Sequence, residues 1–429
     1  GIFLPCKPFP SYCRVTSIKL DQPNFLADLT PGAGKTILAA RIAHAGLSDG
    51  RYEQILVACP TELLKVQWME KLALVGIEIN PYYNSGDLLQ SGYRGAALTY
   101  SQISRGAPVF RMLSSRHKTL VIMDEPHHLG ENKTWGDSIR FAFDNAVARL
   151  LITGTAWRSD NNPIPYVEYP NGEGKSHYVY SYKDAIRDGV CRYVVFPTYE
   201  GTMEWVSGRS GEIQQASFKA QMNEQASSER LRTALNPNGE WIAQVLRDAH
   251  TKLMECRTMG HPNAGGLIVC IDERHAQRMA EVVKRITNCT PLVVTSNTTD
   301  ADMEIERFAK STQEWLIAIK MVSEGVDIPR LRVGVYATNV TTDLFFCQFV
   351  GRFVRWTNGL PEQTAYVYIP EDARIAACAY GIAQERNHVL REETAEDEYD
   401  EWIDPRDGEV RVAHFLGQLA QKRSTMALL

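Results

Sequence analysis

The chain has 429 residues, of which 44% are hydrophobic, 9% aromatic and 23% charged. This length exceeds what one hydrophobic core usually serves, so we expect at least two domains. The composition is that of an ordinary globular protein and excludes a largely disordered or low-complexity chain. The 46 basic and 51 acidic residues give a net charge of −5, so a polyanion would have to bind a local basic groove and not the whole surface.

The sequence shows no sign of a membrane segment or a metal-binding cysteine cluster. No apolar run approaches the roughly 18 residues that cross a bilayer, and the first residues lack the layout of a signal peptide. The nine cysteines are dispersed without a C-x-x-C pair, which is typical of reduced core thiols and not of a zinc ribbon or an iron–sulfur cluster. We therefore expect a cytoplasmic protein without a membrane partner. Because residue 1 is Gly, we also expect the natural N-terminus to lie upstream.

Short apolar runs rich in branched residues alternate with helical patterns, as parallel α/β architecture requires. The runs fall into two sets, which predict two similar lobes, each built on a parallel sheet. The first set comprises residues 25–27, 55–59, 97–100, 120–123 and 150–152, and the second comprises residues 267–270, 292–294, 316–319, 333–336 and 365–369.

The stretch between the two sets predicts a hinge and an insertion. Residues 159–176 are rich in Asn, Pro, Gly and Tyr, which favours a loop leaving the first lobe. Residues 190–206 have strand patterns and residues 212–258 helical ones. We expect a first domain at residues 1–160, a linker with strands and a helical insertion at 161–262, a second domain at 263–390, and an acidic, helical C-terminal extension at 391–429.

The strongest local motif is residues 30–36, Thr-Pro-Gly-Ala-Gly-Lys-Thr, between an apolar strand and an Ala-rich helical pattern. Glycines let backbone N–H groups converge on phosphate oxygens at a helix N-terminus, where Lys35 can reach the β and γ phosphates. Thr36 would place its hydroxyl on Mg²⁺. The full pattern has Gly where this chain has Leu29, so a plain glycine-rich turn is the alternative. The predicted phosphate-binding residues are Pro31, Gly32, Ala33, Gly34, Lys35 and Thr36.

A second motif begins where an apolar strand ends in Asp124 and Glu125. Adjacent residues at a strand end point in different directions, so Asp124 can hold Mg²⁺ through water while Glu125 orients and deprotonates the attacking water. The alternatives are a surface acidic turn, or a metal pair formed by His127 and His128, which lack accompanying ligands. We expect His127 to be a polar link between the nucleotide site and the opposite lobe.

The third motif lies at residues 345–355, where helical spacing places Gln348, Arg352 and Arg355 on one face and phenylalanines on another. An arginine offered across a cleft to a γ-phosphate stabilises the charge of the transition state. Two solvated arginines on an amphipathic helix are the alternative. The predicted catalytic residues of the three motifs are Lys35, Asp124, Glu125, Gln348, Arg352 and Arg355.

These motifs, together with Thr-Gly-Thr-Ala at residues 153–156, occur in the order found in superfamily 2 DEAD/DEAH-box helicases. The chain resembles that family over about residues 25–390, and it looks most like bacterial members close to the type III restriction res subunit. Further matches lie at residues 59–64 and 321–329. The resemblance implies two tandem RecA-like domains, ATP and Mg²⁺ as cofactors, and nucleic acid as a partner, with DNA favoured over RNA.

The resemblance also implies roles for residues outside the three motifs. Gly325 and Asp327 would close on the nucleotide from the second lobe, and His127 would couple hydrolysis to movement together with Thr153, Gly154 and Thr155. The residues that it places along a nucleic-acid strand are Pro60, Thr61, Thr99, Tyr100, Thr295 and Ser323. The family's adenine-reading Gln is not found at its usual spacing, because Gln22 sits too near the phosphate loop; we favour an element that lies upstream of residue 1.

The sequence thus predicts an ATP-dependent motor that moves along nucleic acid. One alternative is a double-stranded DNA translocase subunit for restriction, repair or anti-phage defence, which would need a partner nuclease because no nuclease carboxylate cluster is evident. Another is a nucleotide-gated clamp with little turnover, suggested by Leu29 and by the missing adenine-reading Gln.

Overall fold

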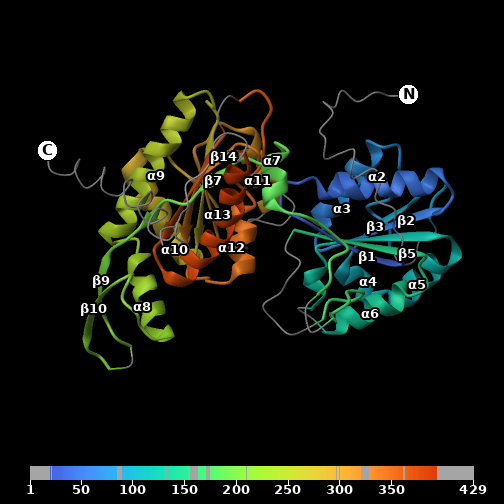
Figure 1. The fold of residues 1–429 in the computed structure, drawn as a ribbon, viewed down its shortest axis with the longest axis horizontal. Helices are drawn as coiled ribbons and strands as arrows, with labels where there is room; N and C mark the ends of the chain where they lie inside the picture. The colour runs from blue at the N-terminus through green and yellow to red at the C-terminus, as the bar shows by residue number, and fades with distance from the viewer. Residues whose placement is uncertain are drawn as a thin grey trace, which may run out of the picture. The chain divides into compact units, whose positions relative to one another are not determined.

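The computed structural model describes residues 20, 22–84, 89–130, 133–154, 163–170, 174–208, 210–295, 297–298, 300–319, 328–360 and 363–393, with backbone alone at 130, 133–134 and 384–393. Two parallel β-sheets, each covered by helices, form the fold (Figure 1). Both sheets belong to one compact unit, which ends at Arg386. The predicted class, α/β with two tandem RecA-like parallel-sheet domains, is confirmed.

The first sheet has six parallel strands in the order β3-β2-β4-β5-β1-β6. All five strands that the apolar runs predict in this lobe are present. The strands are β1 (Asn24–Leu29), β2 (Gln54–Cys59), β3 (Gly95–Thr99), β4 (Thr119–Asp124), β5 (Ala148–Thr153) and β6 (Tyr178–Tyr180). Every residue of β2, β4 and β5 is buried, because helices cover both faces of the sheet.

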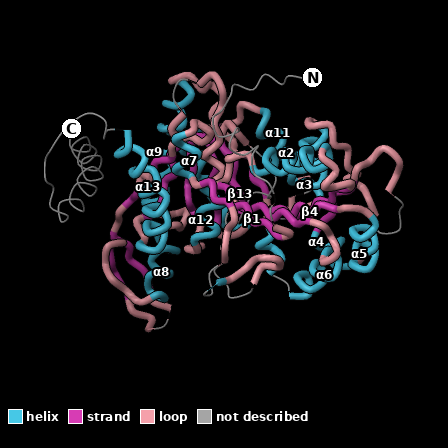
Figure 2. The backbone as a smooth tube through the Cα atoms, turned by 45° about the vertical axis from the view of Figure 1, so that its right-hand side comes forward, coloured by secondary structure: helices cyan, strands magenta, loops and turns pink. Residues whose placement is uncertain are grey.

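Helices pack on both faces of this sheet, as Figures 1 and 2 both show. The first face carries α2 (Lys35–Ser48) and α3 (Glu62–Ala73), and the opposite face carries α4 (Tyr100–Arg105), α5 (Ala107–Arg116) and α6 (Lys133–Phe143). A short 3₁₀ helix, η1 (Pro126–Gly130), follows β4. Parallel strands end at the same sheet edge, so the loops after β1, β2, β3, β4 and β5 meet there.

The second sheet is also parallel and has the order β12-β13-β11-β14-β15-β7, with β8 pairing to β15. Its strands are β7 (Val194–Val195), β8 (Thr198–Tyr199), β11 (Gly265–Cys270), β12 (Leu292–Val294), β13 (Trp315–Ile319), β14 (Leu331–Ala337) and β15 (Ala365–Pro370). The helices of this part of the chain are α9 (Glu240–Thr258), α10 (Glu273–Thr287), α11 (Ala301–Lys310), α12 (Asp343–Val350) and α13 (Ala373–Glu393). The five strands predicted for the second lobe are confirmed.

The segment between the sheets differs from its prediction. Helix α7 (Tyr182–Arg187) follows β6, and a hairpin of β9 (Thr202–Val206) and β10 (Ile213–Ser217) precedes α8 (Glu224–Ala234). The prediction of helix from residue 212 is therefore wrong for residues 213–217. These residues, Ile-Gln-Gln-Ala-Ser, lack a clear alternation of apolar and polar side chains. They form a strand because they pair with β9 in an antiparallel ladder.

The sheets also extend past the domain limits that the sequence predicts. Strand β6 pairs with β1, so the first sheet continues beyond residue 160. Strands β7 and β8 pair with β15, so the second sheet recruits residues that precede position 263. Within the described ranges, no helix combines the length and the apolar character that a membrane crossing demands.

Candidate nucleotide site

The phosphate loop lies between β1 and α2 and is held from the neighbouring edge strand. The Thr30 amide donates to the carbonyl of Tyr180 at 3.0 Å, and the Ala33 amide donates to the carbonyl of Thr30 at 3.1 Å. Gly32 and Gly34 both have φ of 86°, a left-handed conformation that suits glycine. Gly34 caps α2 without a side-chain hydrogen bond. The first N–H groups of α2 therefore form a site for an anion.

Lys35 and Glu125 form an ion pair at the centre of the site. The other carboxylate oxygen of Glu125, Oε2, accepts from the Thr153 hydroxyl at 2.8 Å and from the Gly154 amide at 3.4 Å. Burial by itself raises the pKa of Glu125, but the charges of Lys35 and His127 and the hydrogen bonds from Lys35 and Thr153 lower it to about 2. Glu125 is thus held ionised, in the form that can accept a proton.

Asp124 is buried next to Glu125 and is fixed by two aromatic residues. Its Oδ2 accepts from the indole N–H of Trp68 at 2.9 Å, and its backbone carbonyl accepts from the hydroxyl of Tyr100 at 2.7 Å. Asp124 is 7% exposed, whereas the two aromatic side chains are at most 1% exposed. A charged acceptor makes such a hydrogen bond stronger than one between neutral groups. The position of this carboxylate therefore depends on α3 and on the start of α4.

His127 lies between Glu125 and the second sheet's domain. Its Nδ1 is 3.5 Å from Glu125 Oε2, and its Nε2 is 3.5 Å from the amide nitrogen of Gln348 on α12. The ring also contacts His128, with ring centres 4.4 Å apart. Within the described ranges no group of three or more His, Cys, Asp or Glu side chains is gathered for a metal. The structure places His127 where the sequence predicted a polar link.

The arginine segment has a different conformation from the predicted one. Helix α12 ends at Val350, so Gln348, Arg352 and Arg355 do not share one helical face, and that prediction is wrong. The Arg352 amide bonds to the carbonyl three residues before it, and Arg355 forms an antiparallel bridge with Cys191. The chain turns here because Phe353 is buried against Gly334, where a β-carbon would lie 2.6 Å from the ring. The turn directs this segment towards the phosphate loop.

Arg355 lies against the phosphate loop. A β-carbon built on Gly32 would be 3.6 Å from Cδ of Arg355, 3.1 Å from Val354 and 3.3 Å from the sulfur of Cys191. Arg352 is half-buried in the turn after α12. The Cδ atom of an arginine from the second sheet's domain thus lies beside the phosphate loop.

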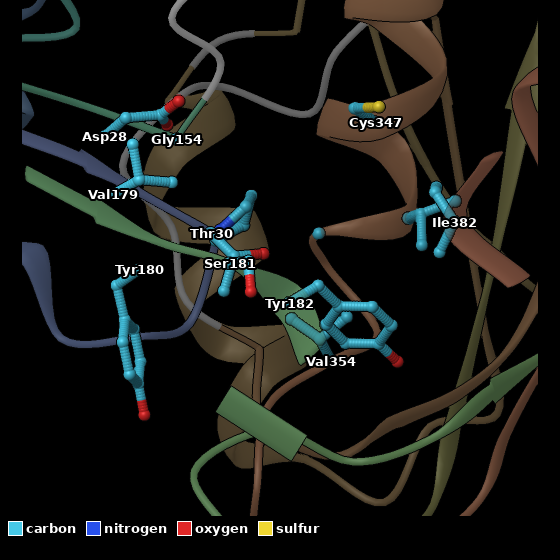
Figure 3. Close-up of a pocket in the computed structure, with 13 residues that line it drawn as sticks. Asp28, Thr30, Gly154, Val179, Tyr180, Ser181, Tyr182, Cys347, Val354 and Ile382 are labelled. Atoms are coloured by element: carbon cyan, nitrogen blue, oxygen red, sulfur yellow. The ribbon is translucent and has the colours of Figure 1, made fainter. Parts of the chain in front are cut away.

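A cavity of about 210 Å³ adjoins the loop. Asp28, Thr30, Ser181 and Tyr182 line it from the side of the first sheet and α7, and Cys347 and Val354 from the second sheet's domain (Figure 3). Figure 3 shows Thr30 and Ser181 beside each other, with Tyr182 and Val354 below them. The strand ends of the first sheet and the segment around α12 therefore share one hollow.

The residues of the site fit a nucleoside triphosphate with Mg²⁺. Lys35, Arg355 and the open N–H groups of α2 suit an anionic phosphate chain. Asp124, Glu125 and the hydroxyl of Thr36 are the oxygen ligands that Mg²⁺ prefers, directly or through water. The lack of a side chain at Gly154 leaves space next to the ammonium group of Lys35, since a β-carbon there would lie 3.1 Å from Lys35 Nζ.

Three of the residues expected along nucleic acid lie at the ends of β2 and β3, at one edge of the first sheet. These are Pro60, Thr61 and Thr99, and both threonines cap helices: Thr61 Oγ1 accepts from the amide of Leu64 at 3.4 Å, and Thr99 Oγ1 from the amide of Gln102 at 3.1 Å.

The other two described residues of this set differ from each other. Tyr100 is fully buried on Asp124, so its side chain cannot face a nucleic-acid strand, and the expectation that it does so is wrong for the side chain. Thr295 follows β12, and its hydroxyl lies 3.5 Å from Glu273 Oε1. The remaining predicted residues lie outside the described ranges: Thr155, Ser323, Gly325 and Asp327.

Sequence reasoning missed Trp68, Cys191 and Arg192, which contact the predicted residues directly. Trp68 holds Asp124, the sulfur of Cys191 lies 3.6 Å from the carbonyl of Pro31, and Arg192 donates to the carbonyl of Arg355. A tryptophan seven residues after a helix cap carries no motif, and contacts with backbone carbonyls leave no trace in side-chain patterns. Gln22, which the sequence placed too near the loop, contacts Nε2 of His177 at 3.0 Å.

Comparison with known proteins gives relatives in both sequence and fold. The family model described as "Type III restriction enzyme, res subunit" matches residues 14–158. An uncharacterized protein of Mycobacterium leprae is 40% identical over 393 residues, covering 90% of this chain and 65% of the relative. One of Mycobacterium tuberculosis is 41% identical over 395 residues, covering 90% and 64%. The chain therefore spans somewhat less than two thirds of the length of these curated relatives.

Solved structures share the fold at low sequence identity. A fragment of a putative HsdR subunit of a type I restriction enzyme from Vibrio vulnificus has a TM-score of 0.59 at 18% identity, covering 85% of this chain and 63% of that one. The Type ISP restriction-modification enzyme LlaBIII bound to DNA has a TM-score of 0.55 at 13% identity, and the match covers 88% of this chain and 29% of that one. Dbp5 of S. cerevisiae, bound to RNA and ADP BeF3, has a TM-score of 0.52 at 12% identity, and the match covers 88% of this chain and 87% of that one.

Proposed function

We propose that this chain, a member of the superfamily 2 helicases with a first domain like the type III restriction res subunit, is an ATP-driven motor that moves along nucleic acid. The observation that carries the proposal is the meeting of Lys35, Glu125 and Arg355 at the phosphate loop. Lys35 binds phosphate and Glu125 accepts a proton. Arg355, from the opposite domain, neutralises negative charge on the phosphate. Phosphoryl transfer to water requires these three roles.

The residues of the chain divide the work of hydrolysis. Bound Mg²⁺ would supply positive charge that offsets the negative charge of the phosphate chain. Lys35 leaves Glu125 for the phosphates, which frees the carboxylate of Glu125 to orient a water molecule and take its proton. Arg355 approaches the γ-phosphate from the second sheet's domain, where its charge stabilises the transition state. Asp124 and Thr36 would hold the metal ion through their side-chain oxygen atoms.

Coupling to movement follows from the contacts of Glu125. Thr153 and Gly154 donate to its carboxylate from the end of β5, and His127 joins it to Gln348 on α12. A change in the charge of the site therefore acts on both domains at once. We infer that loss of the γ-phosphate releases α12 from the loop, so that the two domains separate after each turnover.

We propose DNA as the preferred track, with contacts to its phosphates from the loops after β2, β3 and β12. Two of the structural relatives are restriction enzymes, and one of these is bound to DNA. The relative bound to RNA has a lower TM-score. Contacts to the backbone are independent of sequence and weaken as salt increases.

The test is ATP hydrolysis by the full chain at one salt concentration, alone and with single-stranded DNA, duplex DNA and RNA of equal length. We expect one of the DNA forms to stimulate turnover most. Lys35→Ala, Glu125→Gln and Arg355→Ala should each abolish at least about 99% of the stimulated rate, in line with the loss of a catalytic group. Lys71→Ala and Arg247→Ala, which alter exposed residues of α3 and α9, are the matched controls.

Turnover within a few-fold of the parent in all three site variants would refute the motor. Nucleic-acid binding that depends on ATP, without turnover above that of Glu125→Gln, would instead identify a nucleotide-gated clamp. Stimulation by RNA alone would refute DNA as the track and leave the ATPase assignment intact.

A second candidate is a translocase subunit that moves on duplex DNA without separating its strands and acts with a partner nuclease. The likeness to the HsdR fragment favours it, because that fragment has the highest TM-score of the three structures compared above. Displacement of a triplex-forming strand without unwinding of a forked duplex would select this candidate. Unwinding of the fork would select the helicase.

A further inference from the structure

Arg192 is a fully buried arginine that joins three segments of the chain. It lies just before β7, is 1% exposed, and its guanidinium donates to the carbonyls of Pro329 at 2.6 Å, Leu331 at 3.2 Å and Arg355. A further contact, at 3.5 Å, reaches the hydroxyl of Thr357. A buried charge is tolerated only where hydrogen bonds replace its water, and these carbonyls do so.

The backbone of Arg192 adds to the same connection. Its amide donates to the carbonyl of Val354 at 2.9 Å, next to the antiparallel bridge between Cys191 and Arg355. Both polar groups of one residue, the guanidinium and the amide, thus hold Val354 and Arg355 by their backbone. From the other side, the amide of Gln363 exchanges two hydrogen bonds of 2.7 Å with the backbone of Thr357.

The same residue is tied to the first sheet through α7. The hydroxyl of Tyr182 donates to the carbonyl of Arg192 at 2.7 Å, and Tyr182 opens α7 directly after β6. Tyr180 of β6 accepts from the Thr30 amide in the phosphate loop. A continuous chain of contacts therefore leads from the phosphate loop along β6 and α7 to Arg192 and from there to Arg355.

We propose that Arg192 is the positioning residue of the arginine finger. Its hydrogen bonds hold the backbone of Arg355 in place relative to β6 and α7, which in turn contact the phosphate loop. The planar guanidinium can satisfy three carbonyls from two separate segments at once, whereas a lysine ammonium is a compact point charge that cannot span them. This inference rests on the proposed ATPase function.

The test compares Arg192→Lys with Arg149→Lys in the full chain. Arg149 is also buried and donates to carbonyls, those of Phe143 at 2.9 Å and Ala146 at 3.1 Å, but it lies at the start of β5, away from the arginine segment. Both variants lose a buried guanidinium. Only Arg192→Lys removes the support of Arg355.

Two measurements are made at a temperature where both variants are folded. In hydrogen exchange, we expect the amides of residues 352–357 to exchange at least about 10-fold faster in Arg192→Lys, and at the parent rate in Arg149→Lys. In ATP turnover, kcat should fall at least about 10-fold in Arg192→Lys with KM for ATP within about 2-fold, because a displaced arginine costs transition-state and not ground-state binding.

A double variant distinguishes positioning from a general loss of structure. If Arg192 acts through Arg355, then adding Arg192→Lys to Arg355→Ala should lower kcat by less than about 2-fold. If the losses of kcat in the two single variants multiply in the double variant, the proposal is overturned. Amide exchange at residues 352–357 that is no faster than in Arg149→Lys would also overturn it. If Arg192→Lys does not fold, Tyr182→Phe, which removes only the hydroxyl on the Arg192 carbonyl, is measured by the same criteria.

The outcomes separate this inference from the proposed function. A parent chain without ATPase activity refutes the function, while hydrogen exchange still decides whether Arg192 holds the arginine segment. A fully active parent whose Arg192→Lys variant keeps its kcat and its slow exchange refutes the inference alone.

Discussion

At the scale of single residues, the site consists of groups that already bind one another. Lys35 and Glu125 are paired, and Asp124 is held by Trp68. The sequence predicted the lysine and both carboxylates, because each lies in a short motif with a fixed chemistry. It could not predict Trp68 or Arg192, whose importance comes only from the groups that the fold brings to them.

The charge on Glu125 predicts how stability depends on pH. Its pKa is lowered to about 2, so the stabilisation from its ionised form is complete above its ordinary value near 4.5 and is lost as the pH falls towards 2. We expect the difference in unfolding free energy between the parent and Glu125→Gln to shrink by about 1 to 3 kcal/mol from pH 6 to pH 3. Denaturant unfolding at four pH values measures it. Glu204→Gln, which alters an exposed residue of β9, is the matched control.

The hydrogen bond from Trp68 to Asp124 predicts a second effect. Trp68→Phe keeps an aromatic ring but leaves a buried carboxylate oxygen without this donor, at a cost of about 1.5 to 3 kcal/mol. Trp315→Phe is the matched control, since Trp315 is equally buried and donates to an imidazole, His250 Nδ1, at 3.3 Å. Urea unfolding should find Trp68→Phe the less stable by about 1 kcal/mol; equal losses would contradict a special role for this bond.

At the scale of helices and strands, hydrophobic pattern was a reliable guide where elements are long and buried. All ten strands predicted for the two sheets exist, because fully buried parallel strands are continuous apolar runs. The pattern failed where contacts from elsewhere in the chain decide the structure. Strand β10 depends on β9, and α12 stops at Val350 because Phe353 must turn into the core.

The helix caps at the sheet edge give a prediction of this kind. Thr99 caps α4 and is also proposed to contact nucleic acid, so one side chain would have two roles. Thr99→Ala should lower the unfolding free energy by about 1 kcal/mol, and Thr99→Ser, which keeps the hydroxyl, should restore most of it. Chemical denaturation decides. Thr251→Ala, in the exposed middle of α9, should change stability by less than about 0.5 kcal/mol.

At the scale of the whole molecule, the phosphate loop and the arginine segment come from sequence positions more than 300 residues apart and yet are in contact. A β-carbon on Gly351 would lie 2.6 Å from Pro31 in the loop. The motifs in the sequence implied that these two segments would meet. The path between them through α7 and Arg192 could not be foreseen, because every hydrogen bond in it is accepted by a backbone carbonyl, which all residues possess.

This close contact predicts a position-specific effect of a single methyl group. Gly351→Ala must push the end of α12 away from Pro31, which displaces Arg355, and ATP turnover should fall at least about 10-fold. Gly381→Ala in α13 meets no atom within 4 Å and should leave turnover unchanged while raising stability slightly. Steady-state kinetics and thermal unfolding of both variants check the pair. Unaltered kinetics in Gly351→Ala would show that the contact is not needed.

The support of Arg355 has one more consequence. Arg192 holds the peptide group at position 355, which every amino acid possesses, and not the side chain. Location and chemistry are therefore specified separately at this position: one residue determines where the group stands and another determines what it is. A protein engineer could thus substitute the side chain at position 355 while the backbone there keeps its position. In the same way, natural substitutions at this position could change the chemistry of the site without a change in the surrounding fold.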